Sequence, residues 1–262
     1  MTVAKRFISA VFACLMILFC PGCLTAQDTI SHRTVFPAGL SIGYGVGPYS
    51  VRDEYISSEK YSGVLPAIEL HWSRFHGEYV YYIGFEYESS SDIKNYTVST
   101  DIYQFSLSQG FLYPLPNLSL LKKDVYAFLG PAAELYLFYN NQNIAVSGFD
   151  YAQSHAGLIS AGLDSRFILP LGTKYQAEAG LNLSLLSLGL RMVDMEEEDV
   201  SPVKLLTLLA GSNMSLRLGI RYELFSPVSL KLGYKFHWAR IRSWDPLLSA
   251  GDQAVVGMTF QF

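Results

Sequence analysis

Apolar and polar residues alternate along most of this chain, with the two-residue period of a β-strand. Successive side chains of a strand point to opposite faces, so every second residue shares a face. The clearest segment, residues 175–188, puts these apolar residues at alternate positions: Tyr175, Ala177, Ala179, Leu181, Leu183 and Leu185. The residues between them are polar or small, and the segment therefore predicts a strand with one apolar and one polar face.

About ten segments alternate in this way. They are residues 38–47, 64–75, 78–88, 102–113, 125–139, 155–169, 175–188, 214–224, 228–238 and 254–262. Gly130-Pro131 interrupts the fifth segment and makes its register uncertain. The pattern assigns no place to a further apolar stretch, residues 203–209.

The connections between these segments alternate between long and short. Short turns lie at residues 76–77, 114–124, 170–173 and 226–227, and long polar loops are predicted at 48–62, 89–100, 140–153, 191–213 and 241–252. An even number of antiparallel strands with such connections places all long loops at one end of the sheet. A soluble β-sandwich has shorter strands and no reason for this regularity.

Composition narrows the class of protein further. Half of the 262 residues are hydrophobic and only 16% are charged, whereas soluble domains are about 25% charged. Beyond the amino-terminal region there is no uncharged apolar run of about 20 residues that would span a membrane as a helix. The chain is therefore either an unusually apolar soluble protein or a barrel whose apolar residues are spread over alternating strands.

The last segment carries a resemblance to a known family. Residues 254–262 read A-V-V-G-M-T-F-Q-F and end on an aromatic residue of the apolar face. This ending resembles the closing strand of bacterial outer-membrane β-barrel proteins. The resemblance implies an all-β fold, a closed antiparallel transmembrane up-and-down β-barrel of about ten strands, with eight or twelve as the alternatives. It also implies the bacterial outer membrane as location, the β-barrel assembly machinery as a partner, and an assembly signal formed by Met258, Phe260 and Phe262.

The amino terminus has the pattern of a secretory signal. Lys5 and Arg6 precede an apolar core of about fourteen residues, and small residues lead to Ala26. We expect a signal peptide at 1–26, a short periplasmic segment at 27–37 and the barrel domain at 38–262. Cleavage there removes all three cysteines, although Gly22-Cys23 leaves lipidation of Cys23 as an alternative. The remaining 17 basic and 23 acidic residues give a net charge of −6, which argues against nucleic acid as a partner.

The polar face of the predicted strands carries both signs of charge. A basic residue facing lipid at the bilayer midplane costs about 2–4 kcal/mol, so these groups are expected to face the lumen. They are Glu86, Glu88, Glu134, Asp164, Arg166, Glu178, Arg217, Arg221, Glu223, Lys231 and Lys235. They either pair with one another and fill a narrow barrel or line a polar conduit for a small solute. Four of the bases, Arg217, Arg221, Lys231 and Lys235, either favour an anion locally or are matched by Glu178 and Glu223.

Enzyme and metal chemistry have weaker candidates. His71 lies beside Glu69 and Ser73 on one predicted face, the best acid–base–nucleophile combination available, although a spacing of two is common on strands. The five histidines show no metal-ligand spacing, and the acidic run 196–199 is more typical of a solvated loop than of a calcium site. We therefore predict no metal and no cofactor.

The sequence favours an integral outer-membrane barrel with a side-chain-filled lumen and a structural, surface-interaction or envelope-assembly role. A narrow, porin-like passive channel for small solutes is the first alternative. A barrel enzyme acting on lipid or peptide is the second. The expected partners are outer-membrane lipid and lipopolysaccharide and, in an assembly role, other envelope proteins.

Overall fold

The computed structural model describes residues 35–95, 98–116, 118–120, 123–146, 149–191, 203–242 and 245–262. The predicted signal peptide, its three cysteines and the acidic run 196–199 lie outside these residues. The described residues contain no helix with the length and hydrophobicity needed to cross a bilayer.

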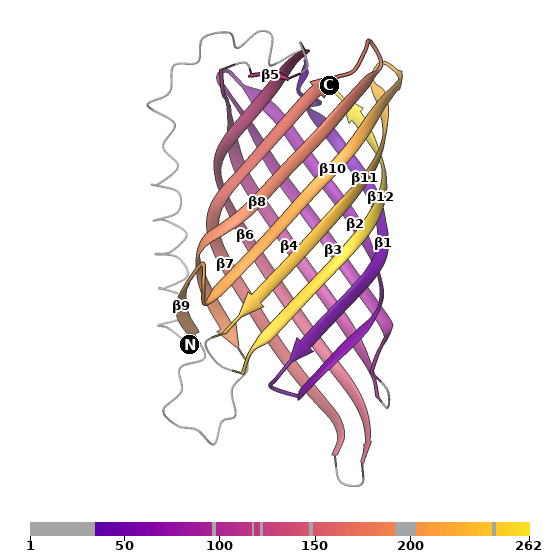
Figure 1. Cartoon of the computed structure of the whole chain (residues 1–262), viewed down its shortest axis with the longest axis vertical. Coiled ribbons are helices and arrows are strands. Elements are labelled where there is room, and N and C mark those ends of the chain that lie inside the picture. Colours follow the sequence, from indigo (N-terminus) through magenta and orange to yellow (C-terminus); the bar gives the residue numbers. More distant parts are fainter. Residues whose placement is uncertain are drawn as a thin grey trace.

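Antiparallel strands wind around one closed barrel (Figure 1). The strands are β1 (Gly39–Asp53), β2 (Ser57–His76), β3 (Tyr79–Lys94), β4 (Ser99–Pro114), β5 (Leu118–Leu120), β6 (Lys123–Val146), β7 (Phe149–Pro170), β8 (Tyr175–Arg191), β9 (Val203–Thr207), β10 (Gly211–Phe225), β11 (Val228–Ile241) and β12 (Leu247–Gln261). Ten of them form the closed wall, which confirms the predicted fold.

The wall closes because its last strand, β12, pairs with its first strand, β1. Each wall strand pairs with the wall strands before and after it, and β12 pairs with β1 from Gln261↔Gly39 to Leu247↔Asp53. β8 pairs directly with β10, so the short β9 lies outside this path on the edge of β8. A closed wall leaves no strand edge unpaired, which is the condition that a lipid environment imposes.

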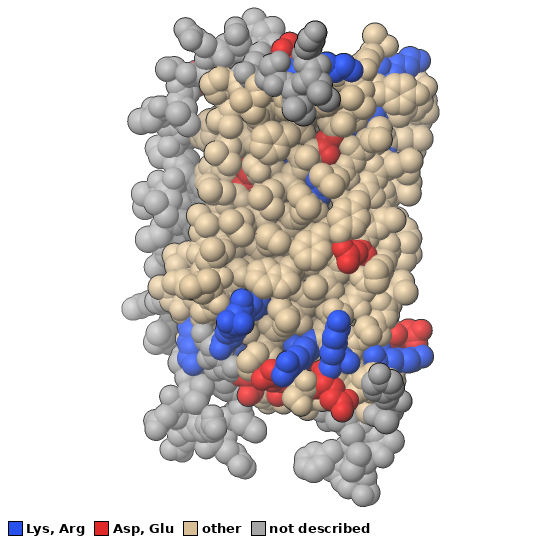
Figure 2. Space-filling model, in the orientation of Figure 1, with Lys and Arg blue, Asp and Glu red and all other residues tan. Residues whose placement is uncertain are grey.

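The two faces of each strand differ as the alternation predicts. The outer face carries large exposed apolar side chains, among them Ile42, Ile68, Phe85, Leu107, Leu137, Leu163, Leu181, Leu218, Leu232, Val256 and Phe260. Figure 2 shows the result on one side of the molecule, a broad and mostly uncharged band above a lower edge rich in Lys and Arg. Residues of the opposite parity face the lumen.

Four of the predicted long loops are wrong over most of their length. β1 continues to Asp53 and β2 begins at Ser57, and β6 and β7 likewise run to Val146 and Phe149 before the chain turns. β3, β4 and β12 also extend into the regions predicted as loops. In these extensions the outer face meets water while inward residues such as Tyr49, Val51 and Tyr61 stay buried. An apolar outer face therefore no longer alternates with a polar inner face, although the backbone ladder continues.

The unplaced apolar stretch forms β9, which pairs with β8 from Leu186↔Thr207 to Leu190↔Val203. Leu206 points inward and is buried, whereas Leu205 is 69% exposed on the outer side. The predicted loop 191–213 thus contains a strand of its own.

A β-bulge in β8 changes which residues face the lumen. The β7–β8 register shifts between Ala161 and Gly162, and it leaves Leu185 without a partner. Leu185 and Leu186 are consequently both exposed on the outer face. Beyond the bulge the parity is inverted, and Arg191, predicted as the start of a loop, is turned into the lumen.

Candidate functional site

The lumen is filled by side chains in three layers. Near the long hairpins lies an apolar cluster that includes Tyr49, Tyr61, Leu65, Ile102, Phe138, Leu158, Ile241 and Leu247. Near the short turns lies a second cluster with Phe36, Phe75, Val80, Tyr82, Leu112, Phe128 and Ile168. Charged side chains occupy the level between them. We call these the hairpin-side layer, the turn-side layer and the polar layer.

Phe36 gives the turn-side layer a residue from outside the barrel wall. Its ring packs edge-on against Phe75 and Phe128, with centroid distances of 5.8 and 5.0 Å. The described part of the predicted periplasmic segment 27–37 therefore lies within the mouth of the barrel, where it fills space that the strands leave open.

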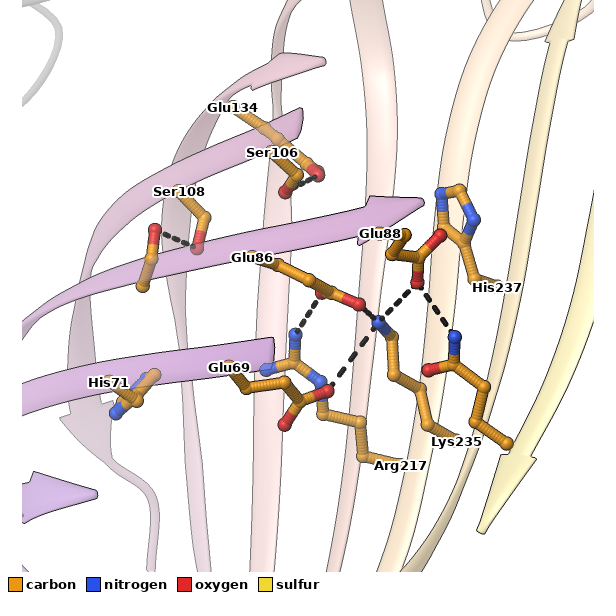
Figure 3. A network of polar contacts seen from close by, with 12 residues as sticks. Glu69, His71, Glu86, Glu88, Ser106, Ser108, Glu134, Arg217, Lys235 and His237 are labelled. Atoms are coloured by element: carbon orange, nitrogen blue, oxygen red, sulfur yellow. Dashed lines mark hydrogen bonds and ion pairs between the residues drawn. The ribbon is translucent and has the colours of Figure 1, made fainter. Parts of the chain in front are cut away.

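Lys235 on β11 is the centre of the polar layer (Figure 3). Its ammonium group contacts Glu86 directly, and it lies 3.5 Å from a carboxylate oxygen of Glu69 and 3.5 Å from one of Glu88. Gln253 Nε2 donates to Glu88 at 2.9 Å. Only 3% of the lysine side chain is exposed, so three carboxylates from β2 and β3 surround one buried cation. We call this group the Lys235 cluster.

Glu178 on β8 has the opposite arrangement. Arg221 Nε donates to Glu178 Oε1 at 2.6 Å, and Lys231 Nζ lies 3.4 Å from Oε2. Here two cations share one carboxylate. Arg217 lies between this Glu178 cluster and the Lys235 cluster, with its guanidinium 3.8 Å from Glu86.

The remaining predicted lumen residues lie at the edges of these clusters. Glu134 accepts hydrogen bonds from Ser106 Oγ at 3.0 Å and Asn213 Nδ2 at 2.8 Å. Arg166 lies 3.4 Å from Asp164. Glu223 lies at the turn end of β10, half-buried, and makes no ion pair among the described residues.

The structure does not bring the three catalytic candidates together. Arg166 Nη2 donates to His71 Nε2 at 2.9 Å, and the imidazole stacks on Tyr82 with a centroid distance of 5.4 Å. The Glu69 carboxylate faces Lys235 instead of the imidazole. Ser73 is buried and contacts neither group through a hydrogen bond within the described residues. No group of three or more potential His, Cys, Asp or Glu metal ligands occurs in the described part of the chain.

The alternation of residues did not lead us to predict one buried ion pair. Asp53 and Arg191 form a salt bridge whose side chains are both 0% exposed. Asn140 Nδ2 donates to Asp53 at 3.2 Å, and Arg191 Nη1 donates to Ser154 Oγ at 3.0 Å. Tyr49, Val51 and Asp53 occupy alternate, inward-facing positions of β1. Continuing the alternation beyond residue 47 would therefore have predicted that Asp53 faces the lumen. Arg191 reaches the lumen only through the bulge in β8.

Two spaces remain between the inward side chains. One of about 40 Å³ is lined by Glu88, Glu134 and Lys235 among others. The other, of about 100 Å³, lies beside the Glu178 cluster. Since each molecule of liquid water occupies about 30 Å³, the smaller space has room for about one water and the larger for about three.

Sequence comparison identifies no relative for this barrel: no protein-family model matches the chain, and no curated protein sequence matches it. Solved structures show what the chain resembles in shape. The outer-membrane protease OmpT from Escherichia coli is 8% identical with a TM-score of 0.49, over 91% of this chain and 99% of that one. Neisserial surface protein A is 13% identical with a TM-score of 0.38, over 86% and 98%.

A third similar structure is the COG4313 outer membrane channel from Pseudomonas putida F1, 9% identical with a TM-score of 0.38, over 90% of this chain and 100% of that one. The closed antiparallel wall of this chain confirms the predicted resemblance to outer-membrane β-barrels. The solved structures are similar in fold alone, and the residues of the lumen have to be interpreted by their own contacts.

Proposed function

We propose that this protein is an integral barrel of the bacterial outer membrane that does not conduct solutes and that acts at the cell surface through its extended hairpins. The three-layered lumen is the observation that carries the proposal. Apolar side chains fill both ends of the barrel, and the charges between them are engaged with one another. A filled lumen is also what a barrel only slightly wider than eight strands favours.

The length of the strands supports the surface role. A tilted strand crosses the hydrocarbon layer with about 9–11 residues. β6 has 24 residues and β7 has 22, which is more than one crossing requires, and their hairpin protrudes at the lower end of Figure 1. A continuous backbone ladder makes such a projection a rigid platform for a partner.

A row of basic residues supports one orientation of the barrel in the membrane, with the extended hairpins at the cell surface. Arg240, Arg52 and Lys60 lie in one cross-strand row on the outer face, because Arg240 and Arg52 both pair with Leu248 and Arg52 pairs with Lys60. Arg52 and Lys60 are exposed and Arg240 is half-buried. Cations at the edge of an apolar band match the phosphates of lipid headgroups. In the proposed orientation, the hairpins face outward, this row meets the outer leaflet, and the short turns face the periplasm.

Conductance of the purified protein in planar bilayers tests the sealed lumen. We expect no discrete openings at moderate voltage, and stable unitary openings would replace our proposal with the narrow channel. Lipopolysaccharide composition with and without the protein, measured by mass spectrometry, tests lipid modification. We expect no change.

The surface role is tested by site-specific photo-crosslinking on intact cells. A crosslinking residue at Gln153, on the protruding part of β7, is expected to capture a surface macromolecule. The matched control at Lys174, in an exposed short turn, should capture only periplasmic material. Equal crosslinking patterns at the two positions, or capture at Lys174 alone, would contradict the proposed orientation and role.

A further inference from the structure

We propose that the lumen contains a binding site for one small inorganic oxyanion of the size of sulfate or phosphate, beside the Glu178 cluster. This site does not depend on the surface role proposed above. The cavity of about 100 Å³ is bounded by inward side chains of the wall and, at the turn end, by Phe36 and Pro37. By the volume of liquid water it has room for about three waters or one such anion.

The charges on this cavity are unequal. Its lining includes four bases, Arg166, Arg217, Arg221 and Lys231, but two carboxylates, Glu69 and Glu178. Glu69 faces Lys235, which leaves Glu178 as the counter-ion of both Arg221 and Lys231. Arg166 and Arg217 have carboxylate neighbours outside the lining, Asp164 and Glu86, at 3.4 and 3.8 Å. A positive surplus therefore faces the cavity next to Glu178.

Buried donors without a partner mark where an anion would be held. The Arg221 side chain is only 7% exposed, and its Nη1 has no hydrogen-bond partner among the described residues. The same is true of the buried Nε of Arg217. A guanidinium carries five donors in a planar fork that fits oxyanions, and a buried donor left unpaired costs about 1–3 kcal/mol. Both orphaned atoms belong to side chains that line this cavity.

Glycines keep the space open. Gly43, Gly180, Gly219 and Gly257, on four different strands, line the cavity. A Cβ atom at Gly219 would lie 3.1 Å from Cε of Lys231, and one at Gly43 would lie 3.6 Å from the Glu69 carboxylate. Side chains at these inward positions would fill the cavity and press on its charged groups. The lining also includes the hydroxyls of Ser41 and Thr259, which are hydrogen-bonded to each other at 2.7 Å.

Equilibrium dialysis of the folded, detergent-solubilised full chain against radiolabelled sulfate tests the site. We expect close to one sulfate per barrel. Arg221→Gln removes the cation with the orphaned donor and should weaken sulfate binding at least tenfold. Gly43→Ala meets only ordinary van der Waals contacts, so it should fold, narrow the cavity and weaken binding severalfold. The matched control, Arg74→Gln, removes an exposed cation of β2 that lies outside the cavity and should leave binding unchanged.

Heat-modifiable migration in detergent gels establishes that each variant is folded before dialysis. Absence of bound sulfate on the folded wild-type barrel would overturn the proposal and assign the cavity to water. Equal loss with Arg74→Gln and Arg221→Gln would also overturn it, because binding would then follow net charge and not the site. Retention of full affinity by both Arg221→Gln and Gly43→Ala would do the same.

Discussion

The Lys235 cluster and the Glu178 cluster lie in the same polar layer and have opposite charge ratios. Around Lys235 one buried cation faces three carboxylates, whereas around Glu178 one carboxylate faces two cations. The excess acid and the excess base are thus separated inside one lumen. Arg217, close to Glu86 and lining the cavity beside Glu178, lies between them.

This separation distinguishes the Lys235 cluster, which is structural, from the Glu178 cluster, which borders the candidate binding site. Three acids around one lysine satisfy that cation fully and leave it no capacity for a ligand. Where two bases share one acid, Nη1 of Arg221 is left unpaired, and the Arg221 side chain lines a cavity. Both clusters are buried, and removing one member of a buried ion pair costs more than the pair itself contributes. The following substitutions test how the two clusters differ.

Lys235→Met should have the largest effect, because it leaves three buried carboxylates without their common cation. We expect a loss of at least about 3–5 kcal/mol in the free energy of unfolding, measured by urea unfolding in detergent micelles with tryptophan fluorescence. Lys60→Met is the control, since Lys60 is exposed on the outer face. Similar stability of the two variants would show that the Lys235 cluster does not hold the polar layer together.

Glu178→Gln should have a smaller effect on stability, about 3 kcal/mol, because the cations that it leaves unpaired border a cavity that admits water or an anion. If our proposal is correct, sulfate should restore part of this loss, as a ligand that binds only the folded state does. The measurement is urea unfolding with and without sulfate. Lys235→Met provides the comparison, and an equal sulfate response in both variants would indicate a general salt effect.

Phe36→Ala should loosen the turn-side layer. Truncation of a buried phenylalanine costs about 3–5 kcal/mol in a tightly packed core, but Phe36 lies at the mouth of the barrel, where water can replace the ring, so we expect about 2 kcal/mol. Hydrogen exchange should speed up near Phe75 and Phe128 and stay unchanged near Tyr49 in the hairpin-side layer. Unchanged exchange at the turn end would mean that Phe36 does not seal it.

Phe262→Asp should have the smallest effect on the folded barrel, about 0–1 kcal/mol, because Phe262 follows the last residue of β12 at the end of the wall, where a charge on the lipid face costs little. If Phe262 belongs to an assembly signal, membrane levels of the variant should nevertheless fall severalfold, as quantified by immunoblots of outer-membrane fractions. Glu59→Asp, a change at an exposed position of β2, is the control. Normal membrane levels of Phe262→Asp would remove this residue from the assembly signal.

The alternation of residues was sufficient to predict the wall of the barrel. The segment 175–188 and its counterparts lie on strands of the observed wall, and the residues from Val256 to Phe260 show the predicted outer and inner faces. This works because lipid and lumen are different environments on the two sides of one strand. Between Pro48 and Asp53 the outer face loses its apolar residues while Tyr49 and Val51 stay buried in the lumen. The apolar-out, polar-in pattern ends there, and the prediction stopped too early.

By itself, the sequence determined the strands within the apolar band, their orientation toward lipid or lumen, and most of the charges that the lumen receives. Only the tertiary structure decided which charges meet. Lys235 reaches Glu69 and Glu86 because β11, β2 and β3 face one another across the lumen, and Arg191 reaches Asp53 because one extra residue in β8 inverts its parity. Strand faces depend on local alternation, whereas contacts across a lumen depend on closure, register and bulges that no single segment encodes.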